Sequence, residues 1–552
     1  MDSKISESLN KILLIGLDGG TYRIIDPLIK EGLLPNLKLM METGSYGILE
    51  STIPPVTAPA WASFMTGKNP GKYGVIQFYD VNGFNEITKE PNLSLYNAEI
   101  VNYNAIRSAT IFDVFKKSEK KIISINIPMT YPPPETNGHV ISCWLTPPNA
   151  ESFTFPKHLK DEISGYRIDQ YFGEKMFALP SSKTFSMSSE TIFNDLIDIL
   201  LLRKNTALKM MKSKPWDIFM ICFTETDRVQ HYFWRVVDKE YHEYTPEINK
   251  EKELFRTFFS TLDTAIGELV NASGKNTSKM IISDHGFTSP AKYRFHINKW
   301  LQDLGLFSVV NNNQDKKNEN QRMNLIKHLF AFFFRKKIEN NETESSKNGD
   351  WTSSKAWGLN LNRNWGGIYI MSDHRDNKLL EKTRKSLLDV EDVLYKRKIV
   401  ENAYTREELY SGPYTDIFPD LVFKLYDDYE AGIEGQIDIS EKSIISHVRP
   451  YPNGRGNHDR EGIYILTDGV FKKMGLSGQY SIQDIFPTIL YLLNLPIPED
   501  IDGRVAMDLI GEKYKSLYPV KWEQPLSVMR DKTDAEQDKE AIKDRLRNLG
   551  YL

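Results

Sequence analysis

The sequence contains few cysteines, no long apolar run near its start and no large excess of charge of either sign. Two cysteines in 552 residues, Cys143 and Cys222, cannot form a disulfide framework, and neither belongs to a CxxC pair of the kind that binds metals. The apolar run Ile12–Leu17 is far too short to cross a bilayer. The N-terminal residues also lack the basic and apolar regions of a signal peptide, so we expect a cytoplasmic protein.

The charges nearly balance, with 70 basic and 74 acidic residues and a formal net charge of −4. Over the whole chain, this balance gives no signal for binding to nucleic acid or to a membrane surface. With 40% hydrophobic and 26% charged residues, the composition is that of a globular protein that can bury a sizeable core. Because single cores rarely grow beyond about 250–300 residues, we expect one large domain with insertions, or two domains.

Compact apolar runs next to polar residues recur along the chain and predict buried strands. Lys11–Leu17 is followed by Asp-Gly-Gly, Trp216–Phe223 by TETD, and Lys279–Ile282 by SDHGF. A fourth run, Gly462–Leu466, instead follows its polar segment, GNHDRE. Short apolar runs of this kind are typical of strands that are covered on both faces.

Helical patterns lie between these runs, over Pro27–Glu42, Ser188–Met211 and Glu253–Val270. The alternation of apolar strand, polar tip and amphipathic helix predicts an α/β fold with a central, mostly parallel sheet and helices on both faces. In such sheets, ligands bind beyond the carboxyl ends of the strands. We therefore expect the functional site at the polar tips of these strands.

Two regions look inserted into this pattern. Residues 77–184 are rich in Tyr, Pro and Asn, and we predict that they form a cap or side layer. Residues 300–440 predict a lid region, in which the stretch 311–350 is polar and flexible. We therefore expect a catalytic domain over 1–515 that carries both insertions, followed by a charged tail over 516–552 with a helix over Val528–Leu552.

Two short segments contain pairs of residues that commonly bind metals. Asp227 and His231 stand four residues apart, so on a helix both side chains would lie on one face and could bind one cation. Asp284 and His285 are adjacent at the end of a predicted strand and are followed by Gly, which allows a sharp turn of the backbone. Each pair alone is ambiguous, because such spacings also arise by chance.

Three further residues lie in similar positions and are uninformative one by one. Asp18 follows the first predicted strand, where a polar residue is usually part of a turn. His458 lies in a Gly-rich segment before the fourth strand, where a surface histidine is the alternative. Thr57 stands between prolines at the start of a predicted helix, so its hydroxyl could be an N-cap or a nucleophile. The positive end of the helix dipole would favour both an alkoxide and a bound phosphoryl oxygen.

The order Asp, Thr, Asp-x-x-x-His, Asp-His, His is far more specific than any of its parts. In this order the sequence resembles the alkaline phosphatase superfamily and, within it, the type I phosphodiesterase/nucleotide pyrophosphatase group, with its predicted phosphohydrolases and phosphomutases. The resemblance runs over nearly the whole chain. It rests on the Thr57 segment and on KILLIGLDGGTYRIIDPLI, INIPMTYPPPETNG, FTETDRVQHYFW, ISDHGF, GNHDREGIYI and SIQDIFPTILYLLNLPIPEDIDGR.

The resemblance implies two divalent cations bound by carboxylates, imidazoles and one hydroxyl. Mixed carboxylate and imidazole ligands suit zinc best, with manganese or iron as alternatives. Three carboxylates and an alkoxide carry a charge of about −4, which two divalent ions would neutralise. By motif match, the first cation would be bound by Asp18, Asp284, His285 and the oxygen of Thr57, and the second by Asp227, His231 and His458.

The resemblance also implies a reaction, in which Thr57 attacks phosphorus and forms a phospho-threonine intermediate. Sulfatases of the superfamily need Cys or Ser at this position and alkaline phosphatases use Ser, whereas Thr matches the diesterases. We therefore predict a metal-dependent hydrolase of a phosphodiester or pyrophosphate. One departure is Ala60, where the pyrophosphatases carry an Asn that donates to a phosphoryl oxygen, and Lys68 or a residue of the cap is a candidate replacement.

Other functions stay open at this point. A phosphomutase or phosphomonoesterase of the same superfamily would need a monoester pocket with several basic residues. A binding protein with a degenerate site is a remote alternative, because all seven expected positions are filled. The substrate is expected to be a small phosphate ester of a nucleotide, a sugar or a lipid-linked group.

Residues 324–337 (NLIKHLFAFFFRKK) combine an aromatic and aliphatic run with flanking Lys and Arg. Such a segment could form an interfacial helix that touches an anionic membrane or a lipid-linked substrate. The favoured interpretation is a lid over the active-site domain.

Overall fold

The segment 324–337 lies outside the residues that the structure describes, as does the stretch 311–350 that was predicted to be flexible. The predicted tail 516–552 is described only up to residue 530. Within the described ranges, no helix combines the length and the apolar character that crossing a membrane requires. The computed structural model describes residues 11–78, 100–147, 150–169, 188–238, 246–308, 353–371, 376–432, 443–448 and 456–530.

A ten-stranded sheet forms the centre of the protein, and β1 (Ile12–Leu17) lies in its middle. β1 pairs in parallel with β6 (Ile218–Phe223) on one side and with β7 (Ser278–Ile282) on the other. Every residue of these three strands is buried, as expected for apolar runs that are covered on both faces. The predicted parallel core of the sheet is therefore confirmed.

The strands follow the order β20-β2-β19-β7-β1-β6-β3-β4-β5. β3 (Ile122–Ile125) and β4 (Gly138–Ile141) continue the parallel part of the sheet beyond β6. β19 (Glu461–Thr467) runs antiparallel to β7 and also to β2 (Ser45–Glu50). Because β19 runs in the opposite direction, residues that precede it reach the same edge of the sheet as residues that follow β1, β6 and β7.

Three strands of the sheet, β3, β4 and β5 (Thr154–Phe155), lie within residues 77–184, which we predicted to form a cap or side layer. For these strands the prediction is wrong, because they belong to the central sheet. Each is four residues long or shorter, and runs this short give little periodicity in a sequence. The segments that connect them are rich in Pro and Asn, so the strands were not recognised in the sequence.

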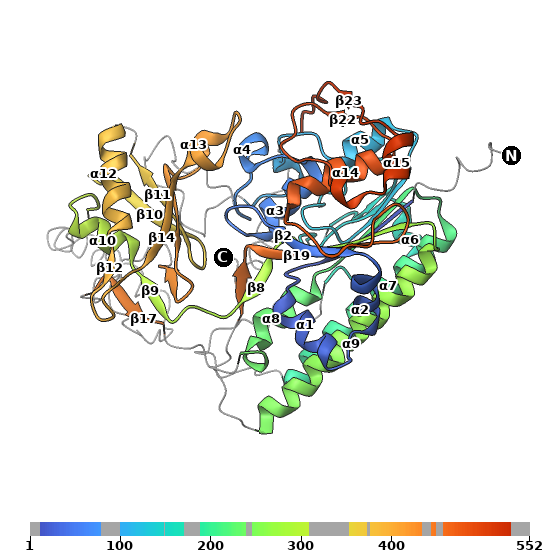
Figure 1. Ribbon diagram of the computed structural model, residues 1–552, viewed down its shortest axis with the longest axis horizontal. Helices are drawn as coiled ribbons and strands as arrows, with labels where there is room; N and C mark the ends of the chain where they lie inside the picture. Colours follow the sequence, from blue (N-terminus) through green and yellow to red (C-terminus); the bar gives the residue numbers. More distant parts are fainter. Residues whose placement is uncertain are drawn as a thin grey trace, which may run out of the picture.

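Helices cover both faces of the central sheet (Figure 1). α7 (Ser189–Ser213) and α9 (Pro246–Ser273) pack with the odd-numbered residues of β1 in one apolar core. α3 (Thr57–Thr66) and α14 (Ile485–Leu492) pack with the even-numbered residues of β1 in the other core. Side chains alternate between the two faces of a strand, so one apolar run supplies both cores.

The helix predicted over Pro27–Glu42 is in fact two helices, α1 (Tyr22–Lys30) and α2 (Pro35–Thr43). Gly32 between them has a φ of 79°, a left-handed conformation that Gly adopts without strain and that ends α1. α2 then starts with Pro at its first position, where the missing N–H costs no hydrogen bond.

A second, smaller sheet lies beside the central one, on the left in Figure 1. Its antiparallel strands fall within residues 300–440, where we predicted a lid region, and the lid role stays a prediction. α10 (Ile297–Asp303) and α12 (Asn377–Leu388) accompany it. We call this sheet the accessory sheet; its strands, in spatial order, are β10 (Ala356–Asn362), β11 (Trp365–Ile370), β15 (Leu421–Leu425) and β14 (Val400–Thr405).

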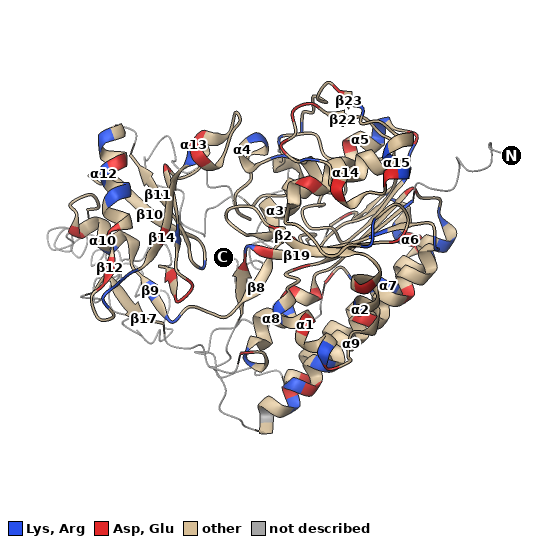
Figure 2. Ribbon diagram, viewed as in Figure 1, with Lys and Arg blue, Asp and Glu red and all other residues tan. Residues whose placement is uncertain are grey.

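Charges of both signs are interspersed along the outer helices α7, α9 and α12 (Figure 2).

The remaining elements are short and connect or border the two sheets. They include α4 (Pro70–Tyr73), α5 (Ile111–Lys117), α6 (Leu159–Glu162), α13 (Arg406–Leu409), α15 (Glu512–Leu517), β9 (Tyr293–Phe295), β16 (Tyr429–Ala431), β17 (Ile445–His447), β22 (Ile497–Pro498) and β23 (Trp522–Glu523). β20 (Gly475–Leu476) and β21 (Tyr480–Ser481) pair with β2 in the central sheet.

Candidate metal centre

The six side chains predicted as aspartate and histidine ligands meet at one edge of the central sheet. They form two groups, each with its ligand atoms within 4.8 Å of one another. The carboxyl ends of parallel strands bring such residues together, because every strand ends at the same edge. The groups consist of Asp18 after β1, Asp227 and His231 on α8 (Glu225–Phe233) after β6, Asp284 and His285 after β7, and His458 on β18 (Asn457–Asp459) before β19.

The first cluster consists of Asp18, Asp284 and His285, all at most 2% exposed. Nε2 of His285 lies 3.6 Å from Oδ1 of Asp18 and 3.3 Å from Oδ2 of Asp284. The other oxygen of Asp284 accepts a hydrogen bond of 3.1 Å from the backbone N–H of Gly19. Gly19 has a φ of 68°, so the turn after Asp18 requires a residue without a Cβ atom.

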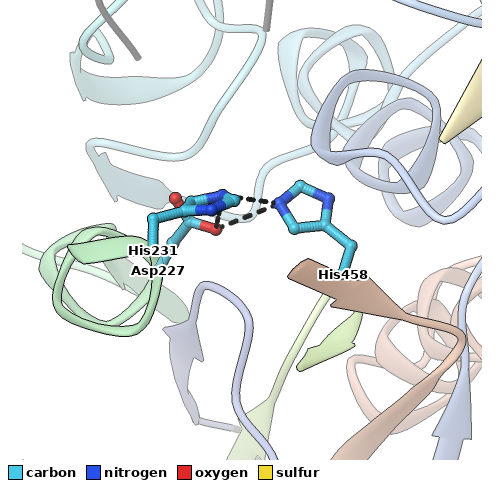
Figure 3. Close-up of side chains that lie close together, drawn as sticks. All are labelled: Asp227, His231 and His458. Atoms are coloured by element: carbon cyan, nitrogen blue, oxygen red, sulfur yellow. Dashed lines mark hydrogen bonds and ion pairs between the residues drawn. The ribbon is translucent and has the colours of Figure 1, made fainter. Parts of the chain in front are cut away.

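The second cluster consists of Asp227, His231 and His458 (Figure 3). Oδ1 of Asp227 lies 3.4 Å from Nε2 of His231 and 3.3 Å from Nε2 of His458. The two Nε2 atoms are 3.0 Å apart, close to the separation of about 3.4 Å that two ligands at about 2.0–2.1 Å from a tetrahedral zinc ion would have. A neutral imidazole has one acceptor nitrogen, and both rings direct theirs to the same point.

In each of the three histidines of the two clusters, the second ring nitrogen, Nδ1, lies against a backbone carbonyl. Nδ1 of His285 lies 3.1 Å from the oxygen of Gly286, and Nδ1 of His231 lies 3.1 Å from the oxygen of Gly456. Nδ1 of His458 lies 3.2 Å from the oxygen of Pro55. A carbonyl only accepts, so each Nδ1 carries a proton. In the neutral form of such a ring, Nε2 has the lone pair that binds a cation, the arrangement usual for metal-binding histidines.

The two clusters are in direct contact. The rings of His285 and His458 stack with their centroids 3.7 Å apart. β8 (Gly286–Thr288) pairs antiparallel with β18, and in this pairing Phe287 is opposite His458. Phe287 also packs edge-on against His231, with the ring centroids 4.8 Å apart. This two-stranded ribbon therefore fixes the distance between the clusters.

Thr57 is the first residue of α3 and is completely buried beside the first cluster. Its Oγ1 lies 3.1 Å from Nε2 of His285. The N-cap position belongs to Val56, so the alternative interpretation of Thr57 as an N-cap is wrong. At its other end, α3 stops at Gly67, which adopts a left-handed conformation. The structure thus places the hydroxyl at the positive end of a helix, next to a predicted metal ligand.

The charges of the two clusters respond differently to burial. Burial raises the pKa of Asp18 well above its usual value, and the carboxylates of Asp284 and Asp227 raise this pKa further. Burial also raises the pKa of Asp284 and lowers the pKa of His285 to about 4. Burial would raise the pKa of Asp227 too, but His231 and its neighbouring imidazole outweigh burial and hold this pKa well below its usual value. A cation in the first cluster would favour the ionised carboxyl groups that burial disfavours.

The residues present fit a pair of divalent cations. In the described part of the chain, Oδ1 of Asp18 and Oδ2 of Asp284 are buried and have no hydrogen-bond partner. A buried carboxylate oxygen without such a partner is costly unless a cation binds it. Both oxygens face Nε2 of His285, so three ligand atoms converge. The donor set of carboxylates and imidazoles is the one that zinc and similar metals prefer.

Two buried ion pairs that involve residues of α8 were not predicted from the sequence. The guanidinium of Arg203 binds Glu225, and both side chains are 1% exposed. Arg228 pairs with both oxygens of Asp169: Nη1 lies 2.6 Å from Oδ1 in an ion pair, and Nη2 donates a hydrogen bond of 3.1 Å to Oδ2. Arg228 lies between the ligand positions 227 and 231, so this bidentate pair fixes the helix that carries them. An Arg in a ligand motif is the one signal that could have indicated such a pair.

Lys68 does not replace the Asn that is missing at Ala60. It follows the C-terminal end of α3, about 15 Å from Thr57 along a helix of this length. Its amino group binds Asp500 and donates to Oγ of Ser108 at 2.8 Å. Lys68 therefore ties α3 to the C-terminal part of the chain.

Comparison of the sequence with protein families matches residues 12–431 to the family described as Type I phosphodiesterase / nucleotide pyrophosphatase. A comparison with curated proteins finds no match. Among solved structures, the chain is similar to phosphonoacetate hydrolase from Sinorhizobium meliloti 1021 in complex with phosphonoformate. The identity is 16%, with 88% of this chain and 95% of that chain covered and a TM-score of 0.48.

The chain is also similar to murine ectonucleotide pyrophosphatase / phosphodiesterase 5, with 13% identity, 91% of this chain and 100% of that chain covered, and a TM-score of 0.48. The human ectonucleotide pyrophosphatase / phosphodiesterase 5 gives 12% identity, coverage of 91% and 99%, and a TM-score of 0.48.

Proposed function

Because this chain belongs to the type I phosphodiesterase / nucleotide pyrophosphatase family, we propose that it cleaves a phosphodiester or pyrophosphate with Thr57 as its nucleophile. Family membership makes the protein a hydrolase of phosphate esters. The observation that carries the finer proposal is the position of the Thr57 hydroxyl, 3.1 Å from Nε2 of His285 in a completely buried site. Among the described residues, this hydroxyl is the nucleophilic group that the clusters surround.

Two divalent cations, with zinc as the first candidate, would lower the pKa of the hydroxyl and offset the charge of the transferred group when bound. The first set of residues that would bind a cation is Asp18, Asp284, His285 and Oγ1 of Thr57. The second set is Asp227, His231 and His458. The convergence of Nε2 and carboxylate atoms in each set supports this assignment.

In the proposed reaction, Oγ1 of Thr57 forms a bond to phosphorus while the bond from phosphorus to the leaving oxygen breaks. The product of this step is a phospho-threonine whose phosphorus still carries the second substituent of the substrate. A water molecule then hydrolyses the bond to Oγ1, which releases that substituent as its phosphate and restores the hydroxyl. The N-terminus of α3 supports both steps, because its dipole favours negative charge on the nucleophile and on the phosphoryl oxygens. Burial of the site excludes competing water from the first step.

The pairing of Arg228 favours a diester over a monoester. A phosphate monoester carries one more negative charge on its transferred group, and an Arg clamp commonly binds it. Arg228 lies on α8 between two proposed ligands, but Asp169 already binds it in a bidentate pair. Its charge is therefore largely neutralised, as suits a diester.

The test is a panel of p-nitrophenyl monoesters and diesters with zinc, manganese or iron, run with the unaltered protein and with Thr57→Ala. We expect diester hydrolysis that Thr57→Ala lowers by at least about 10⁴-fold, because the covalent step is lost. Acid quenching of a diester reaction, followed by mass spectrometry, should find the phosphoryl group with its remaining ester substituent on residue 57 of the unaltered protein alone.

Three results would contradict the proposal. Monoester hydrolysis without diester hydrolysis would indicate a phosphomonoesterase. Isomer exchange of a sugar monophosphate, without release of free phosphate, would indicate a phosphomutase. A purified protein that binds neither zinc nor manganese would remove the two-metal centre altogether.

A further inference from the structure

The turn between β10 and β11 reaches from the accessory sheet into the candidate metal centre. Nδ2 of Asn362, the last residue of β10, donates a hydrogen bond of 3.0 Å to the backbone oxygen of Pro55. The same nitrogen lies 3.2 Å from Nδ1 of His458. One side chain of the accessory sheet therefore contacts both a proposed metal ligand and the segment that leads to the proposed nucleophile.

The oxygen of Pro55 is the shared point of these contacts. It lies 3.2 Å from Nδ1 of His458, and a carbonyl oxygen has two lone pairs, so it accepts from the imidazole and from Asn362 together. With its proton on Nδ1, His458 presents Nε2 to Asp227. Pro55 is also two residues before Thr57, so the position of this carbonyl affects both the ring and the hydroxyl.

The turn that carries Asn362 is itself held firmly. The backbone oxygen of Arg363 accepts from the N–H of Ala431 at 2.7 Å, and the oxygen of Asn364 accepts from the N–H of Leu425 at 2.7 Å. Arg363 has a φ of 40°, an uncommon conformation for a residue with a Cβ atom, which persists where surrounding contacts impose it. The amide of Asn362 thus projects from a fixed turn.

A second hydrogen-bond donor, which follows α13, binds the segment that leads to Thr57. The hydroxyl of Tyr410 donates to the backbone oxygen of Ile53 at 2.8 Å. Tyr410 is 4% exposed and stacks on Phe418 with the ring centroids 4.1 Å apart. The segment from Ile53 to Val56 is therefore fixed at two carbonyls by side chains that lie 307 and 357 residues later in the sequence.

We propose that Asn362 is a positioning residue of the active site, through which the accessory sheet aligns His458 and the Thr57 segment. The inference rests on the proposed function and deepens it. Asn362 touches neither phosphorus nor a reacting atom. It holds the carbonyl of Pro55, which in turn fixes the tautomer and the orientation of the imidazole of His458. Contacts of this kind commonly change metal affinity or activity by about 10–100-fold.

The matched control is Asn360→Ala. Asn360 lies on the same strand, is partly buried like Asn362, and donates to a backbone oxygen, that of Ala431. Asn360 lies on β10 and Ala431 on β16, so neither partner of this bond belongs to the two clusters. The substitution therefore removes a comparable hydrogen bond without touching Pro55 or His458. The difference between Asn362→Ala and Asn360→Ala therefore measures the contact with the metal centre.

The experiment uses full-length protein stripped of metal. Zinc is titrated into the unaltered protein, Asn362→Ala and Asn360→Ala by calorimetry, and kcat and KM are then measured on a diester. We expect Asn362→Ala to lower the affinity for the more weakly bound zinc by about tenfold and kcat by about 10–100-fold, with KM nearly unchanged. Asn360→Ala should differ from the unaltered protein by less than about threefold in each quantity, because its lost bond lies outside the site.

Melting temperatures without metal show whether each variant folds. Should Asn362→Ala fail to fold, Asn362→Ser, which keeps a shorter donor, takes its place, and a smaller loss in the same two quantities is expected. Equal zinc affinity and equal kcat for the Asn362 variant and Asn360→Ala would overturn the inference while leaving the proposed function intact. An unaltered protein that binds fewer than two zinc ions would overturn both.

Discussion

The two clusters use the same kinds of side chain but differ in charge and in access to solvent. The first has two carboxylates and one imidazole, and each of its residues is at most 2% exposed. The second has one carboxylate and two imidazoles, and the side chain of His231 is 18% exposed. A cation in the first cluster would be bound by more negative charge and by more deeply buried ligands. We therefore expect the first cluster to bind its metal more tightly and to exchange it more slowly.

The clusters also differ in what holds them in place. Asp18 and Asp284 extend from β1 and β7, adjacent strands of the central sheet. The second cluster combines α8, β18 and, through Asn362, the accessory sheet. The comparison indicates that the central sheet positions the carboxylates of the first cluster, whereas three separate parts of the protein position the second.

The largest contrast is expected between His285→Ala and His231→Ala. Loss of a cation from the first cluster would remove several kcal/mol of transition-state stabilisation next to Thr57, and so lower kcat/KM by about 10³-fold or more. Replacement of the partly exposed His231 should lower kcat/KM less, by about 10–100-fold. Added imidazole should partly restore His231→Ala and leave His285→Ala inactive, because the ring of His285 is completely buried. Equal rescue of both variants would contradict the contrast.

Chelation should separate the two clusters thermodynamically. At a free metal concentration about a thousand times the dissociation constant, each bound ion stabilises the folded protein by about 4 kcal/mol. Raising the chelator concentration should release the ion of the second cluster first, with one drop in melting temperature, and the ion of the first cluster later, with another. Metal content and melting temperature measured on the same samples would test this order. Simultaneous loss of both ions would refute it.

The smallest effect concerns stability without metal. Because burial raises the pKa of Asp18 in the folded protein, that carboxyl binds its proton more tightly than in the unfolded chain. Stability of the metal-free protein is therefore lost as the pH rises from about 4, the unfolded pKa, through the raised folded pKa. Asn cannot ionise, so metal-free Asp18→Asn should be more stable than the unaltered protein by about 1–3 kcal/mol at pH 8.

Denaturant unfolding in the presence of chelator would measure this difference at several pH values. The advantage of Asp18→Asn should shrink as the pH falls to about 4, and it should vanish below that value, where the carboxyl of the unaltered protein is protonated in both states. With metal present, the same variant should lose activity, because a ligand is missing. A difference in stability that does not change with pH would show that ionisation of Asp18 is not its cause.

Much of the fold could be predicted because the deciding residues are local. The apolar runs of β1, β6 and β7 are buried on both faces, so their sequences contain the signal for a parallel sheet. The two helices at Pro27–Glu42 were predicted as one helix, because only one glycine and one proline interrupt an otherwise continuous apolar pattern. β5 was missed because two residues carry no periodicity.

The sequence by itself determined which side chains meet in the first cluster. A polar residue placed directly after a buried strand must emerge at the edge of the sheet where neighbouring parallel strands also end, so Asp18, Asp284 and His285 had to meet. Only the tertiary structure decided which groups surround that set. Asn362 and Pro55 are 307 residues apart, and Asp169 and Arg228 are 59 apart. Neither contact joins the ends of neighbouring parallel strands. Each depends on how whole sheets and helices dock, which no local pattern of residues encodes.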